Sequence, residues 1–305
     1  MSRILNDVPI LFLVFNRPDT TKQVFERISE AKPKRLYVAS DGSREGRDGE
    51  AQRVAEVRDI ATNVDWDCEV ITLFRSKNLG CEKAVGGAIS WFFQHEEAGI
   101  ILEDDCVVDL SWFDFASEAL QNYRENPEVM SVSALSNLGP NYKPDQDYVF
   151  SKYPLCWGWA SWRRAWENYD ARMHDWPELR KGRWLAEFPH EGFLFESYWR
   201  EIFDRVYSGQ MNSWAYRWTY SCWKVGGYSI IPSENFVENI GFDANATHTG
   251  TDVYGFSKLK VGHIKPRIST RNEIAINPEV EKRIGKYQHG ISLNNYFRRA
   301  ISHFF

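Results

Sequence analysis

Three neighbouring acids, Glu103, Asp104 and Asp105, follow an apolar run that begins at Gly99. Carboxylates placed this closely repel one another and are costly to remove from water, so we expect positive charge to face them. Their oxygens suit a hard divalent cation such as Mg²⁺ or Mn²⁺, which often takes one or two carboxylates together with phosphate oxygens. A solvated loop beside a helix start also explains clustered acids, and Asp109 has the type and position of a helix cap.

Polar residues also end three earlier apolar segments of the chain. These residues are Asn16 and Arg17, then Asp41, then Arg75. Segments with helical spacing of apolar residues separate these runs, and such strand–helix alternation predicts an α/β fold with a mostly parallel sheet covered by helices. Since the carboxyl ends of parallel strands meet at one edge of the sheet, the four polar clusters are expected to converge there.

The familiar phosphate-binding loops are missing from the sequence. The chain has no G-x-x-x-x-G-K-[ST] motif, and "NRPDTT" stands after the first apolar run where G-x-G-x-x-G would be expected. A backbone cradle for phosphate is therefore not predicted, which favours phosphate held by a metal ion.

The second half of the chain is rich in aromatic residues. It contains the segment "CWGWASWRRAWENYD", two helical patterns around 191–209 and 213–227, a strand pattern from 228, and a tail with amphipathic spacing. The thirteen Trp residues suit either a tryptophan-heavy core or stacking on sugars and bases. The pattern weakens near 250, so we divide the chain into a domain at 1–250 and an extension at 251–305 that packs on the domain or at a membrane surface.

Composition narrows the class of protein. The net charge of −5 argues against nucleic acid as the main partner. The five cysteines are an odd number and are widely spread, which indicates reduced thiols rather than a disulfide framework or a zinc site. The charged N-terminus and the lack of a membrane-length apolar run lead us to expect a cytoplasmic protein, with peripheral membrane contact as an option for the amphipathic tail.

Seven short motifs together resemble the GT-A glycosyltransferases, and in particular the inverting, metal-dependent N-acetylglucosaminyltransferases and related bacterial sugar transferases. In chain order they are "FNRPDTT", "ASDGS", "FRSKNLGCEKAV", "ILEDDCVV", "VSALSNLG", "CWGWASWRRAW" and "ATHTG", and they cover most of the chain from Pro9 to about Gly250. The resemblance implies a GT-A fold, a nucleotide-diphosphate sugar donor and a role in bacterial polysaccharide biosynthesis.

The resemblance also implies roles for individual residues. Arg17, with Asn16, would lie against the donor base, Asp41 would bind the base or ribose, and Arg75 would make a further nucleotide contact. Asp104 would face the ribose or donor sugar, Glu103 would also belong to the nucleotide-sugar site, and the metal ligands would be Asp105 and His248. The residues expected to form a platform for sugar and acceptor are Trp157, Gly158, Trp159 and Trp214.

One position departs from the family pattern. Relatives carry an acid in the helix start that corresponds to "NSWAYRW", where it serves as general base toward the acceptor hydroxyl, but this chain has Ala215 there. The nearby acids Glu234, Glu238 and Asp243 are candidates to replace the base, and we predict Glu238 as the catalytic residue.

The leading hypothesis is an inverting glycosyltransferase that uses Mn²⁺ or Mg²⁺. Its donor would be a UDP-linked sugar, with UDP-GlcNAc as one option, and its acceptor a hydroxyl of a glycan or a lipid-linked molecule. A sugar nucleotidyltransferase is an alternative, although "FNRPDTT" lacks the glycines such an enzyme would use. A non-catalytic relative that only binds carbohydrate or nucleotide sugar is another, because of Ala215.

Overall fold

The computed structural model describes residues 7–188, 192–242, 259–262, 268, 270–271 and 273–302. An eight-stranded sheet runs through the protein in the order β3-β2-β1-β4-β8-β6-β9-β7, and β5 and β10 form a second, two-stranded sheet. The strands are β1 (Ile10–Val14), β2 (Arg35–Ser40), β3 (Glu69–Phe74), β4 (Ala98–Glu103), β5 (Cys106–Val108), β6 (Val129–Ser133), β7 (Tyr148–Ser151), β8 (Trp159–Trp162), β9 (Tyr228–Pro232) and β10 (Val237–Asn239).

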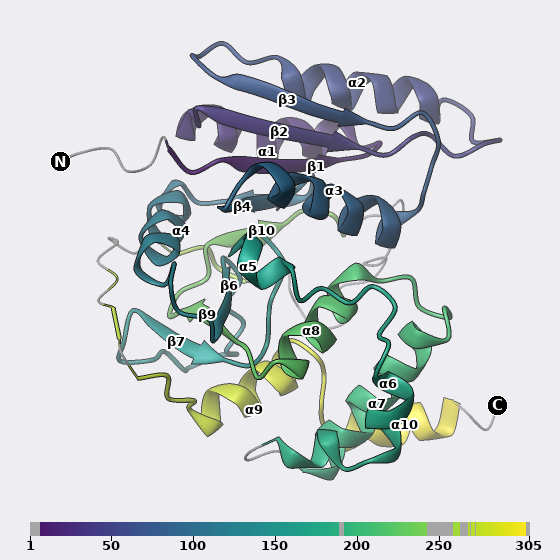
Figure 1. Cartoon of the computed structure of the whole chain (residues 1–305), viewed down its shortest axis with the longest axis vertical. Helices are drawn as coiled ribbons and strands as arrows, with labels where there is room; N and C mark the ends of the chain where they lie inside the picture. The colour runs from purple at the N-terminus through teal and green to yellow at the C-terminus, as the bar shows by residue number, and fades with distance from the viewer. Residues whose placement is uncertain are drawn as a thin grey trace.

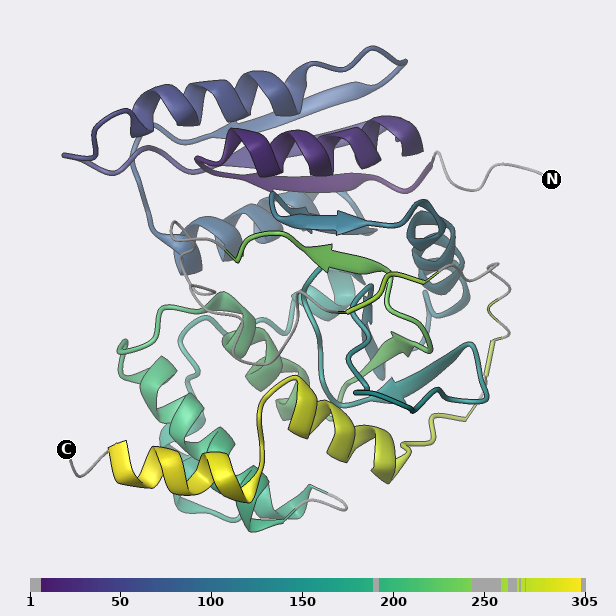
Figure 2. The ribbon, with the colours of Figure 1, turned by 180° about the vertical axis from the view of Figure 1, so that it is seen from behind.

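The helices cover both faces of the first half of this sheet. The helices of the described residues are α1 (Pro18–Ala31), α2 (Glu50–Thr62), α3 (Cys81–His95), α4 (Leu110–Asn122), α5 (Arg163–Trp166), α6 (Trp176–Lys181), α7 (Phe193–Tyr207), α8 (Trp214–Lys224), α9 (Pro278–Tyr287), α10 (Leu293–Ser302) and the 3₁₀ helix η2 (Trp184–Glu187). Helices α1 and α2 lie side by side on one face (Figure 2), and α3 lies on the other (Figure 1).

The predicted α/β fold with a mostly parallel sheet is confirmed. Strands β1 to β4 are all parallel to one another, and β6 is parallel to β9. Strand β8 pairs antiparallel with both β4 and β6, and β7 pairs antiparallel with β9. The second half of the sheet is therefore mixed, which an alternating strand–helix pattern in the first half does not reveal.

Burial explains why the strands form where they do. All five residues of β1 are buried, and β4 is buried from Gly99 to Leu102 before it ends at the half-buried Glu103. Strands covered by helices on both faces are expected to be continuously apolar. Strand β3 lies at the edge of the sheet, and its residues are exposed or half-buried.

The C-terminal helices pack onto the second half of the molecule. The ammonium of Lys152, just after β7, pairs with the Glu281 carboxylate of α9 at 2.9 Å, and both side chains are buried. Val280 and Ile284 of α9 are fully buried. The boundary predicted at residue 250 lies outside the described residues and stays a prediction. Within the described part of the chain, no helix combines the length and apolar character needed to cross a bilayer.

Candidate functional site

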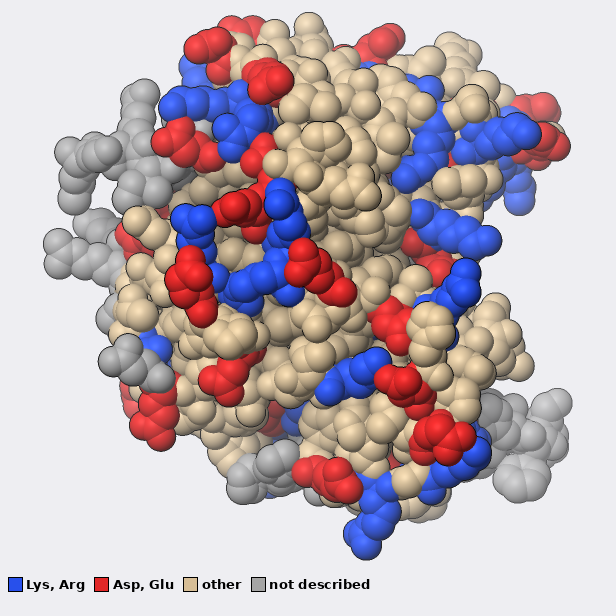
Figure 3. All heavy atoms as spheres, viewed as in Figure 1, with Lys and Arg blue, Asp and Glu red and all other residues tan. Residues whose placement is uncertain are grey.

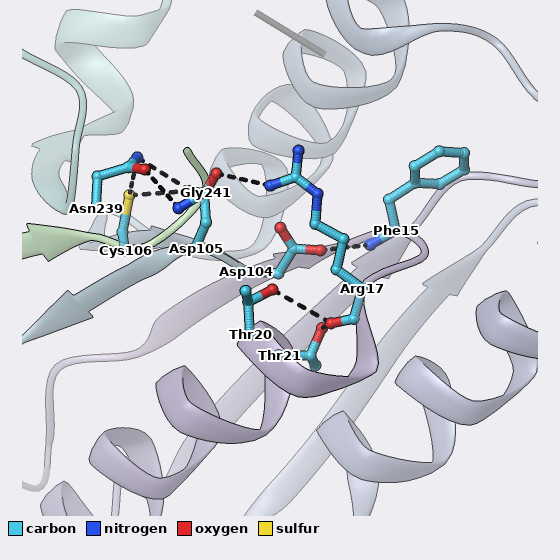
Figure 4. A network of polar contacts seen from close by, with 9 residues as sticks. All are labelled: Phe15, Arg17, Thr20, Thr21, Asp104, Asp105, Cys106, Asn239 and Gly241. Carbon is cyan, nitrogen blue, oxygen red and sulfur yellow. Dashed lines mark hydrogen bonds and ion pairs between the residues drawn. The ribbon is translucent and has the colours of Figure 1, made fainter. Parts of the chain in front are cut away.

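The acidic cluster lies where the end of β4 meets the end of β1. The backbone N–H of Phe15 donates to Asp104 Oδ2 at 3.1 Å, and the Arg17 guanidinium pairs with Asp105 Oδ2 at 3.2 Å (Figure 4). Helix α1 fixes the position of Arg17, because the Arg17 carbonyl accepts hydrogen bonds from the backbone and hydroxyl of Thr21. The positive charge that the sequence led us to expect is therefore supplied in part by Arg17.

A second strand, distant in sequence, encloses Asp105 from the other side. The Asn239 side-chain amide of β10 donates to Asp105 Oδ1 at 3.3 Å, and the Asn239 side-chain oxygen Oδ1 accepts the backbone N–H of Gly241 at 2.9 Å. A Cβ atom on Gly241 would lie 2.2 Å from Asp105 Oδ2, so a glycine is required for this close approach. The antiparallel pairing of β10 with β5 brings these residues together.

The negative charge of the cluster exceeds the positive charge around it. Burial, together with repulsion from Asp105, raises the pKa of Glu103 to about 8 and that of Asp104 to about 7. Burial also raises the pKa of Asp105, and Arg17 acts in the opposite direction on all three acids. A further cation at this edge would stabilise the ionised form of the cluster.

The carboxylate oxygens of this cluster are suitable ligands for a hard divalent cation. All of its candidate donors are carboxylate oxygens, the type that Mg²⁺ and Mn²⁺ prefer, and these ions commonly take one or two carboxylates plus phosphate oxygens and water. No group of three or more His, Cys, Asp or Glu side chains is placed to hold a metal in the described ranges. His248, the other predicted metal ligand, lies outside these ranges.

Asp41 lies at the end of β2, as the strand-end argument predicts, and its carboxylate binds the neighbouring loop. It accepts the backbone N–H groups of Gly42, Leu79 and Gly80 at 2.9–3.1 Å. These bonds hold the loop after β2 against the start of α3. Contact between Asp41 and a nucleobase stays a prediction.

Asn16 is held by a buried acid that the sequence analysis missed. The Asn16 amide donates to Glu50 Oε1 at 2.9 Å, and Glu50, which begins α2, is fully buried. Glu50 also accepts the backbone N–H and the guanidinium of Arg44, and these bonds lower the pKa of Glu50 to about 2. An acid in the first turn of the helix pattern was the available signal, since acids favour that position.

Arg75 follows β3 and brings a cation toward the same edge. Its backbone N–H donates to the Ser40 carbonyl at the end of β2, and its guanidinium lies near Gly87 of α3. Burial lowers the pKa of Arg75, and Asp41 counteracts this effect. Among the described residues, the Arg75 guanidinium makes no hydrogen bond or ion pair, and its contact with a nucleotide stays a prediction.

The start of α8, which contains Ala215, is tied to the start of α3. Asn212 accepts the backbone N–H of Glu82 at 3.2 Å, and Arg217 pairs with the Glu82 carboxylate at 3.2 Å. Glu82 follows Cys81, whose pKa is raised to about 12 by burial and by the charges of Glu103 and Asp105. The helix start that carries Ala215 thus contacts the start of α3, and the start of α3 lies near Glu103 and Asp105.

Two of the acids suggested as substitutes for the base, Glu234 and Glu238, lie in the described residues. Strand neighbours point to opposite faces, so Glu238 projects away from the side on which Asn239 contacts Asp105, and Glu238 is exposed. The catalytic role of Glu238 stays a prediction. Glu234 pairs with Lys143 instead, and Asp243 lies outside the described residues.

The predicted tryptophan platform is largely part of the core. Trp159 is fully buried and stacks on the buried Trp214, with ring centroids 5.7 Å apart. Both rings are buried in this structure, and their role as a sugar platform stays a prediction. Gly158 has a positive φ of 61°, and a Cβ there would lie 2.9 Å from Val108 Cγ1. Trp157 is half-buried, and its contact with an acceptor stays a prediction.

Comparisons with known proteins give no family. No family profile matches the chain, and no curated protein sequence matches it. Among solved structures, the chain is similar to 4-diphosphocytidyl-2C-methyl-D-erythritol synthase from Anaerococcus prevotii, with 13% identity, a TM-score of 0.35, and coverage of 65% of this chain and 85% of that one.

Two further solved structures show the same level of similarity. Mouse xyloside xylosyltransferase 1 is 12% identical with a TM-score of 0.35, and the match covers 71% of this chain and 81% of that one. A UDP-glucose pyrophosphorylase in complex with UDP-glucose is 10% identical with a TM-score of 0.31, covering 53% and 78% of the two chains.

Proposed function

We propose that the chain is a glycosyltransferase that moves a sugar from a UDP-linked donor to a hydroxyl of a glycan or lipid-linked acceptor. The observation that carries the proposal is the meeting of Asp105 with Arg17 at the carboxyl edge of a parallel sheet. Ligands of open α/β sheets bind at this edge, and an excess of carboxylates there suits a donor that arrives with a divalent cation.

The residues at this edge would divide the work of binding the donor. Asp105 would hold Mn²⁺ or Mg²⁺, which supplies positive charge for the departing diphosphate. Glu103 and Asp104 would accept hydrogen bonds from ribose or sugar hydroxyls. Arg17 and Arg75 would bring further positive charge to the nucleotide, and Asn16 would contact its base.

A second candidate function rests on Ala215. An inverting transferase needs a group that takes the proton from the acceptor hydroxyl, and the methyl group of Ala215 offers no proton acceptor at the position where the family resemblance implies one. A relative that binds the nucleotide sugar without transferring it has the same edge chemistry and differs only in this step.

Calorimetric titration of UDP and UDP-GlcNAc, with Mn²⁺ and with EDTA, tests donor binding. We expect Mn²⁺-dependent binding by the parent chain, and we expect Asp105→Asn to weaken it about 10–100-fold, the effect of losing an interaction with a charged group. Asp109→Asn is the matched control, because Asn also caps helices well and the same change is made four residues away. A parent chain that binds neither nucleotide with Mn²⁺ would refute the proposal.

The products then separate the candidate reactions. Release of UDP from a UDP-sugar in the presence of acceptor glycans indicates transfer, and formation or consumption of pyrophosphate indicates a nucleotidyltransferase. Donor binding without either product supports the non-catalytic relative.

A further inference from the structure

The three most exposed large apolar side chains of the described residues lie together at one end of the molecule. Phe193 begins α7, Leu293 and Phe297 belong to α10, and their exposed fractions are 64%, 61% and 59%. Tyr296 joins the two helices, since its ring packs edge-on against Phe193 at a centroid distance of 5.3 Å. Single exposed apolar residues are ordinary, whereas a group of them marks an interaction surface.

Local contacts fix the helix that carries most of this surface. The Ser292 hydroxyl accepts the backbone N–H of Asn295 at 3.3 Å, as an N-cap does, and the Asn295 amide donates to the Gly290 carbonyl at 2.9 Å. Residues three and four apart share a helix face, so Leu293, Tyr296 and Phe297 are presented together. Helix α10 lies along α7 at the end of the molecule opposite β3 (Figure 2).

Charge indicates which partner this surface suits. From Ile291 to the C-terminus the sequence contains Arg298 and Arg299 and no Asp or Glu, although the whole chain carries a net charge of −5. On the face shown in Figure 3, by contrast, acidic and basic groups lie beside one another in several places, separated by uncharged areas. Aromatic residues beside arginines are typical of segments that lie at the boundary between lipid headgroups and acyl chains.

We propose that the end patch, defined as Phe193, Leu293, Tyr296 and Phe297, rests on the surface of an anionic bilayer. A ten-residue helix such as α10 is about 15 Å long, too short to span a bilayer, so it would lie in the plane of the membrane surface. The apolar side chains would enter the headgroup region, and the arginines of the same segment would meet anionic lipids. This inference does not depend on the proposed transferase activity.

Vesicle flotation of the full chain tests the inference. The vesicles are phosphatidylcholine alone and phosphatidylcholine with phosphatidylglycerol. We expect flotation with the anionic vesicles only, and about a tenfold or greater loss of binding for Leu293→Ser/Phe297→Ser, because two large apolar side chains no longer enter the membrane. The double variant Leu110→Ser/Val225→Ser, which changes two exposed apolar residues elsewhere, is the matched control and should float like the parent.

A variant without the two arginines tests whether anionic lipids contribute to binding. Arg298→Gln/Arg299→Gln should weaken binding to the anionic vesicles about fivefold for each arginine, and added salt should do the same. Equal flotation of the parent and Leu293→Ser/Phe297→Ser overturns the proposal. It is also overturned if the parent does not float and sedimentation velocity shows a dimer that this variant abolishes, because the patch is then an interface between two copies of the chain.

Discussion

Replacing Glu50 by Gln should lower stability through the buried network that positions Asn16. Glu50 is fully buried, and its carboxylate binds the Arg44 backbone N–H at 2.6 Å, the Arg44 guanidinium, and the Asn16 amide. A glutamine keeps the size of the side chain and one acceptor oxygen but removes the charge. The Arg44 guanidinium then loses its ionic partner, and the loop after β2 loses its attachment to α2.

The size of the effect follows from the pKa of Glu50. A decrease from 4.5 to about 2 corresponds to roughly 3 kcal/mol of stabilisation at neutral pH. The Arg44 side chain is 46% exposed, so solvent screening reduces the expected loss for Glu50→Gln to about 2 kcal/mol. Because the pKa of Glu50 is lower in the folded state, this stabilisation is complete above pH 4.5 and is lost as the pH falls toward 2.

Urea unfolding at pH 7 and pH 3 measures this loss. We expect a difference of about 2 kcal/mol between the parent and Glu50→Gln at pH 7, which at pH 3 falls to roughly half. Glu56→Gln makes the same change at an exposed position of α2 and should leave stability unchanged. A double-mutant cycle with Arg44→Met should show coupling of about 1–2 kcal/mol. Additive effects, or a difference that does not change with pH, would refute the reasoning.

Two further predictions concern His289 and Ala215. Burial and the nearby Lys152 lower the pKa of His289 to about 3, so the folded state binds fewer protons than the unfolded state, and stability is lost as the pH falls below 6.5. His289→Phe keeps an aromatic ring beside Trp199. Between pH 7 and pH 5 the variant should lose about 1–2 kcal/mol less unfolding free energy than the parent. If urea unfolding shows the same loss for both proteins, the prediction is contradicted. Ala215→Asp should raise sugar transfer about 10²–10⁴-fold if a missing base limits the reaction, and a parent chain that is already as fast as the variant would place the base elsewhere.

The first half of the fold was readable from the sequence because its signals are local. Each strand is a short apolar run, each helix has apolar residues at helical spacing, and strand ends are marked by polar residues such as Arg17, Asp41 and Glu103. In a parallel sheet these ends share one edge by necessity, so the alternation alone predicted their convergence. The Arg17–Asp105 ion pair, between residues at two of these ends, is a direct consequence of that rule.

Long-range pairing decided what the local pattern left open. Asn239 reaches Asp105 only because β10 pairs with β5 across more than a hundred residues, and Glu238 is turned away by the same pairing. Trp159 and Trp214 have the composition of a sugar platform, yet packing between β8 and α8 buries both. Burial and cross-strand contacts depend on which elements come together in space, so the side-chain types determined what chemistry was available and the tertiary structure determined which residues are placed to perform it.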